Sequence, residues 1–172
     1  MQTVLIIFLC IFSAVTYGIV HDQVTVRICI EYFTIGHPPV FSTESPTLLA
    51  LGWGVIAAWW VGLLLGVPLA MAAQVGRRPR RTATSLVRPI LMLLTIMACC
   101  ALIAGVVGLA LAKMGLLSLP EPLASMVPRD KHVRFIIDWC AHLGSYISGF
   151  TGGVVLIVMT WKRRRVLMAP AK

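Results

Sequence analysis

The stretch from Leu48 to Arg81 constrains the fold of this chain more than any other. About 28 uncharged and mostly apolar residues, 48–75, lead directly into the basic sequence Gly-Arg-Arg-Pro-Arg-Arg. A helix of about 20 apolar residues is long enough to cross the hydrocarbon core of a bilayer, and arginines in short loops are retained on the cytoplasmic side. The sequence therefore predicts a transmembrane helix whose C-terminal end faces the cytoplasm.

The composition extends this prediction to the whole chain. Of the 172 residues, 59% are hydrophobic and only 12% are charged, whereas soluble domains carry about 25% charged residues. The net charge is +9. In a membrane protein, basic residues beside the spans set the topology and contact anionic lipid, so we expect no nucleic-acid partner. The lipid bilayer is the first expected partner.

Further apolar runs predict an all-α membrane protein built as one four-helix transmembrane bundle, residues 1–172. The expected spans are 4–20, 48–75, 89–112 and 135–161; the outer loops are 21–47 and 113–134, the cytoplasmic loop is 76–88 and the cytoplasmic tail is 162–172. Both termini are then cytoplasmic, as in a multi-pass protein of a bacterial inner membrane. A cleaved signal peptide is the alternative for 4–20, but no lysine or arginine precedes that run and no A-x-A-like site follows it.

The distribution of charge agrees with this topology. Ten basic residues fall on the predicted cytoplasmic side and five on the outer side, as the positive-inside rule expects. We interpret one group of arginines as topology anchors in contact with lipid headgroups: Arg77, Arg78, Arg80, Arg81, Arg163, Arg164 and Arg165. All six acidic residues and all four histidines fall on the outer side or at its boundary, so that is where we look for function.

The first outer loop contains an alternating pattern. Between Val24 and Tyr32, apolar and polar residues alternate with period two, which is typical of a β-strand. The sequence therefore predicts a small extracytoplasmic cap that contains one short strand and is made by the two outer loops.

The outer side also carries the candidate metal ligands. Asp138 and His142 lie four residues apart at the outer end of the last span, so they share one helix face and could share a metal ion or a proton. Glu31 and His37 are further candidates from the first outer loop. In the simpler interpretation, Asp138 only hydrogen-bonds His142 and fixes helix packing.

Small residues recur at a spacing of four in the predicted spans, a pattern that allows helices in lipid to pack closely. We expect them in the contacts of the bundle or of an oligomer: Gly62, Gly66, Gly105, Gly108, Gly144, Gly149 and Gly153.

The five cysteines include no C-x-x-C pair, so they indicate neither a zinc site nor a thioredoxin-like motif. Cys29 and Cys140 could form a disulfide if their Cα atoms approach within about 7 Å; free thiols are the alternative.

No catalytic constellation is recognisable, and no cofactor is predicted. The favoured hypothesis is a non-enzymatic accessory or assembly subunit that packs against other membrane subunits or against itself. One alternative is an oligomeric channel or transporter component with an outer vestibule at Asp138 and His142. The second is a membrane metalloprotein or redox protein with an outer-face histidine and carboxylate site.

Overall fold

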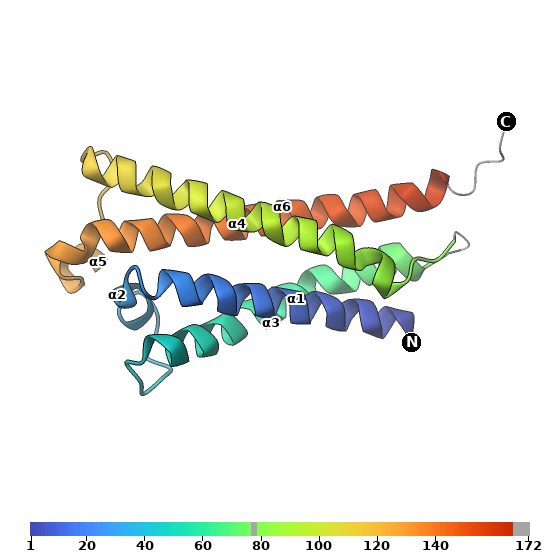
Figure 1. Ribbon diagram of the computed structural model, residues 1–172, viewed down its shortest axis with the longest axis horizontal. Coiled ribbons are helices and arrows are strands. Elements are labelled where there is room, and N and C mark those ends of the chain that lie inside the picture. The colour runs from blue at the N-terminus through green and yellow to red at the C-terminus, as the bar shows by residue number, and fades with distance from the viewer. Residues whose placement is uncertain (77–78, 167–172) are drawn as a thin grey trace.

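The computed structural model describes residues 1–76 and 79–166 of the 172-residue chain. Four long helices run along its long axis (Figure 1): α1 (Gln2–Thr25), α3 (Pro46–Gln74), α4 (Ala83–Lys113) and α6 (His132–Val166). Three short elements lie in the connections: α2 (Ile30–Thr34), α5 (Leu123–Met126) and the 3-10 helix η1 (Arg129–Lys131). The prediction of an all-helical chain with four helices long and apolar enough to span a membrane is confirmed.

The long helices pack as two pairs, α1 with α3 and α4 with α6. Small residues set the close approach of α1 and α3: a Cβ atom added at Gly62 would lie 2.6 Å from the Cα atom of Ile11. Between α4 and α6, a Cβ atom added at Gly144 would lie 2.6 Å from that of Ala104. Because neither gap leaves room for a larger side chain, these glycines fix the distance between the paired helices.

The predicted strand is wrong, since the described part of the chain contains no strand. Helix α1 continues through residues 21–25, and the chain then makes a turn and enters α2. The alternation does not match the burial either, because Val24 is 59% exposed whereas Cys29, on the predicted polar face, is buried. The segment instead makes hydrogen bonds of the helical type, such as that from the Cys29 N–H to the Thr25 carbonyl (3.0 Å). A short alternating pattern is therefore not enough to form a strand here.

The two connections expected to form a strand-containing cap are instead made of coil and short helices. They pack against the start of α6 in one apolar cluster that contains Cys29, Leu119, Val127, Phe135 and Ile136. The connections therefore close one end of the bundle through side-chain packing.

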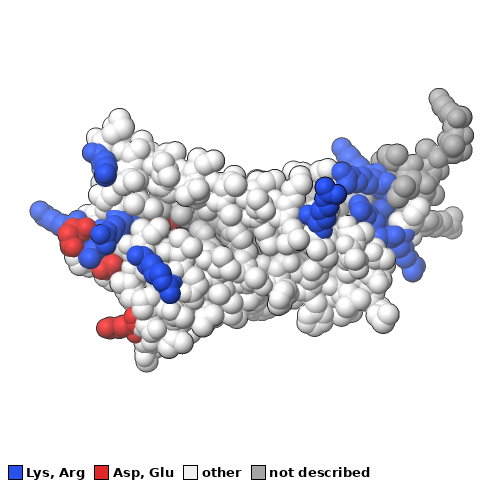
Figure 2. Space-filling model, viewed as in Figure 1, with Lys and Arg blue, Asp and Glu red and all other residues white. Residues whose placement is uncertain are grey.

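The two ends of the bundle differ in their charged residues (Figure 2). We call one end the arginine-rich end; its described basic residues are Arg80, Arg81, Arg88, Lys162, Arg163 and Arg164. We call the other the histidine end; it carries all four histidines and all six acidic residues of the chain. Of the predicted anchors, Arg77, Arg78 and the side chain of Arg165 lie outside the described residues.

Arg164 differs from the exposed anchor expected at this position, because its side chain is completely buried. Its guanidinium donates hydrogen bonds to the backbone carbonyls of Ala72, Val75 and Pro79. The last carbonyls of a helix lack partners within the helix, and a basic side chain can satisfy them. Arg164 thus joins the end of α3 to α6.

Candidate metal centre

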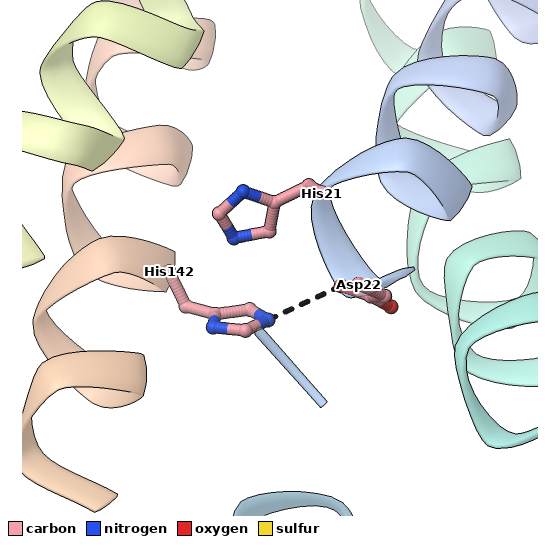
Figure 3. A group of neighbouring side chains, drawn as sticks. All are labelled: His21, Asp22 and His142. Atoms are coloured by element: carbon pink, nitrogen blue, oxygen red, sulfur yellow. Dashed lines mark hydrogen bonds and ion pairs between the residues drawn. The ribbon is translucent and has the colours of Figure 1, made fainter. Parts of the chain in front are cut away.

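Two histidines and one aspartate meet between α1 and α6 at the histidine end (Figure 3). His21 and Asp22 lie near the C-terminal end of α1, and His142 lies on α6. One potential ligand atom from each side chain lies within 4.8 Å of the other two. Asp22 and His142 are 5% and 4% exposed, so these two side chains are shielded from solvent, whereas His21 is half-buried.

The closest contact in this group joins Nε2 of His142 to Oδ1 of Asp22, at 3.3 Å. Nδ1 of His142 lies 2.8 Å from the backbone carbonyl oxygen of Asp138. A carbonyl can only accept, so Nδ1 carries a hydrogen and a neutral His142 directs the lone pair of Nε2 at Asp22. A carboxylate facing that lone pair needs a cation between them, either a proton or a metal ion.

His21, the residue before Asp22 in α1, completes the group (Figure 3). The two imidazole rings meet edge to face with centroids 4.6 Å apart, and the ring of Tyr17 stacks on His21 at 5.8 Å. Nε2 of His21 is buried and has no hydrogen-bond partner in the structure. Since a buried nitrogen without a partner is unfavourable, this atom is suited to a ligand that the group would hold.

A cavity of about 70 Å³ adjoins the group. Its lining includes Tyr17, His21, Asp22, His142 and Ser145. The Ser145 hydroxyl donates to the Tyr17 hydroxyl oxygen at 3.0 Å, so two polar groups face this space beside the histidines. The cavity leaves room for a water molecule or a small ligand next to a bound ion.

Aromatic side chains of α2, in the first connection, pack against His142. Tyr32 stacks on His142 with ring centroids 4.5 Å apart, and Phe33 approaches the same imidazole at 5.9 Å. These rings exclude water from one side of His142. A low local dielectric strengthens the interaction between charged groups placed there.

Asp138 and His142 are hydrogen-bonded, but through the Asp138 main chain and not through its carboxylate. His142 bonds the backbone carbonyl of Asp138, whereas its side-chain partner is Asp22, 120 residues away. The Asp138 carboxyl group is fully buried. Asp138 therefore positions the His142 ring through its main chain. Its carboxyl group lies outside the ligand group, by which we mean His21, Asp22 and His142.

Glu31 and His37 also lie outside the ligand group. Glu31 accepts a hydrogen bond from the Cys29 thiol at 3.3 Å. Nδ1 of His37 donates to the Tyr32 carbonyl at 2.8 Å, and its ring contacts Trp53 with centroids 4.5 Å apart. Burial lowers the pKa of His37 below its usual value, which favours the neutral imidazole.

All five cysteines are free, so Cys29 and Cys140 form no disulfide in the structure. Burial, reinforced by the hydrogen bond to Glu31, raises the pKa of the Cys29 thiol to about 12. This thiol is protonated at neutral pH and is a poor metal ligand, since metals bind the thiolate.

Sequence reasoning missed His21 and Asp22 as site residues because hydropathy alone ended the first span at Val20. A signal was present in the sequence: Tyr17, His21 and Thr25 recur at a spacing of four, which places them on one helix face.

Comparisons with protein-family models, curated proteins and solved structures find no significant match to this chain.

Proposed function

We propose that this chain is a membrane metalloprotein that holds one divalent transition-metal ion between His21, Asp22 and His142. The observation that carries the proposal is the gathering of three potential ligand atoms within 4.8 Å. Zinc–ligand lengths of about 2.0–2.1 Å at the tetrahedral angle separate neighbouring ligands by about 3.3 Å. The contact from His142 to Asp22 already has this length, 3.3 Å.

The ligand types favour particular ions. Imidazole nitrogens with one carboxylate suit Zn²⁺, and a two-histidine, one-carboxylate set with open positions also suits Fe²⁺. The bond from His142 to the Asp138 carbonyl resembles the outer-shell contacts that orient ligating histidines. Three protein ligands leave a coordination position free, and the adjoining cavity could hold water or a small ligand there.

The charge distribution supports an orientation for the site. With the arginine-rich end on the cytoplasmic side, both termini are cytoplasmic and the metal lies near the outer face. This orientation in a bacterial inner membrane remains part of the proposal.

The other two hypotheses receive less support. A channel needs a polar path along the bundle, yet the cavity at mid-length has an almost entirely apolar lining that includes Val61, Leu65, Leu69, Leu94 and Ile157. An accessory or assembly role stays a prediction, and it is compatible with a metal site.

A metal titration of the purified full-length protein tests the proposal. The protein is stripped of metal in mild detergent and titrated with Co²⁺, whose visible absorption reports coordination geometry. Wild type should bind one ion per chain. Outer-shell changes cost about 10–100-fold in affinity, so Asp22→Asn, which removes a ligand, should cost at least about 100-fold.

Asp138→Asn is the matched control, because it makes the same substitution at a second buried aspartate, one that lies outside the ligand group. It should retain the cobalt spectrum. Absence of stoichiometric binding by wild type, or equal binding by Asp22→Asn with unchanged helicity and elution volume, would refute the proposal.

A further inference from the structure

We propose that the groove between α4 and α6 at the arginine-rich end binds one anionic phospholipid. This groove has a volume of about 460 Å³ and lies far from the candidate metal centre. It is basic at its mouth and apolar along its walls. The inference is independent of the metal proposal.

The basic mouth is formed by three arginines from separate segments: Arg81 precedes α4, Arg88 lies in its second turn, and Arg163 lies near the end of α6. Arg88 and Arg163 are exposed, and neither side chain makes a hydrogen bond or an ion pair with the side chains and backbone that the structure describes. The Arg81 guanidinium has one long hydrogen bond, 3.4 Å, to the Ser85 carbonyl. Three guanidinium groups thus line one groove with their donors largely free.

No Asp or Glu side chain is available to neutralise these arginines, because all six acidic residues lie at the histidine end. Arginine presents its donors in a planar fork that matches a phosphate in a bidentate manner. The mouth of the groove therefore fits a phosphate group.

The apolar walls identify the rest of the occupant. Met92 and Ile96 of α4 face the groove together with Val155 and Met159 of α6, and these side chains are between 43% and 64% exposed. Met92 and Ile96 lie about 6 Å and 12 Å further along the helix than Arg88, from a rise of about 1.5 Å per residue. An acyl chain attached to a phosphate at the mouth would follow this path into the membrane.

An anionic lipid fits both parts of the groove, because its phosphate can contact the basic mouth while its acyl chains contact the apolar walls. Basic pockets between transmembrane helices are suited to anionic headgroups. Inorganic phosphate would use only the mouth, and a zwitterionic lipid would add a positive choline group close to the arginines. We therefore assign the groove to an anionic diacyl lipid such as phosphatidylglycerol.

Native mass spectrometry of the full-length protein in mild detergent tests the assignment. Phosphatidylglycerol, phosphatidylcholine or inorganic phosphate is added in separate titrations. Wild type should retain one phosphatidylglycerol molecule, with at least about tenfold preference over phosphatidylcholine. The reason is that each arginine near an anionic headgroup strengthens the binding of that lipid. Equal retention of both lipids, or binding of inorganic phosphate as tight as that of phosphatidylglycerol, would overturn the assignment.

Two double variants with equal charge separate the groove from general electrostatic attraction. Arg88→Gln with Arg163→Gln removes two arginines of the mouth, whereas Arg80→Gln with Lys162→Gln removes two basic residues of the same end that do not line the groove. The first pair should lose at least about tenfold in affinity and the second less than about threefold. Equal losses in both would overturn the proposed site.

Discussion

Nε2 of His142 on α6 lies 3.3 Å from Oδ1 of Asp22 on α1, although 120 residues separate them in the chain. The helix pair α1 and α6 is not among the closely packed pairs of the bundle. At the histidine end these two helices meet through polar side chains, including the Ser145 and Tyr17 hydroxyls. A cation bound beside Asp22 would therefore connect helices that small residues do not bring together.

This arrangement predicts that a bound metal stabilises the bundle. A ligand that binds only the folded state adds about 2.7 kcal/mol of stability at a free concentration of 100 times Kd. Chelation of metal-loaded wild type should lower its melting temperature in detergent, and it should leave that of Asp22→Asn unchanged. Equal melting curves for wild type with and without metal would contradict this expectation.

Arg164→Ala should destabilise the arginine-rich end, because three backbone carbonyls would lose donors from a buried guanidinium. Hydrogen bonds to charged groups contribute about 1.5–3 kcal/mol each, and partial replacement by water leads us to expect a loss of about 2–4 kcal/mol. Thermal unfolding in detergent measures the effect.

Lys162→Ala is the control for Arg164→Ala, since Lys162 is exposed on the same helix end. It should change the free energy of unfolding by less than about 0.5 kcal/mol. Similar losses in the two variants would show that charge at this end, rather than the buried contacts of Arg164, determines stability.

Gly62→Ala and Gly105→Ala should differ sharply, although the sequence gives both glycines the same packing role. An added Cβ at Gly62 would lie 2.6 Å from a backbone atom of α1, whereas at Gly105 the nearest atom, from Ile137, is 3.5 Å away. Overpacking costs about 1–3 kcal/mol, so only Gly62→Ala should lower the melting temperature clearly. If Gly105→Ala were the more damaging variant, the helix pairing described here would be wrong.

Part of the fold could be predicted from the sequence. Hydropathy over a long run such as 48–75 directly measures suitability for a hydrocarbon core, so the four helices were predictable. Local sequence does not distinguish Arg164 from Arg163, because the burial of Arg164 depends on carbonyls at the end of α3.

The candidate site was predictable only in part. His142 and the outer face were identified because ionisable residues are rare within spans. The spacing of four residues suggested Asp138 as the partner of His142, but the actual partner, Asp22, is brought there by helix packing. Such packing is a tertiary effect that no local periodicity contains.

Cys29 should resist alkylation in the folded protein. Its side chain is 2% exposed, and with its pKa raised to about 12 only about one molecule in ten thousand carries the thiolate at pH 8. Iodoacetamide at pH 8, read by peptide mass spectrometry, should leave Cys29 unmodified until the protein is denatured in SDS. A Cys29–Cys140 disulfide peptide found without reduction would contradict the free thiols of the structure.

X-ray absorption spectroscopy of the metal-loaded, full-length protein tests whether His21, Asp22 and His142 hold the metal. With Zn²⁺ bound, we expect a first shell of nitrogen and oxygen at about 2.0–2.1 Å, with the multiple scattering of two imidazole rings. In His142→Gln one imidazole contribution should disappear. A first shell of water oxygens alone, of sulfur, or one that is identical in wild type and His142→Gln, would contradict a metal centre at His21, Asp22 and His142.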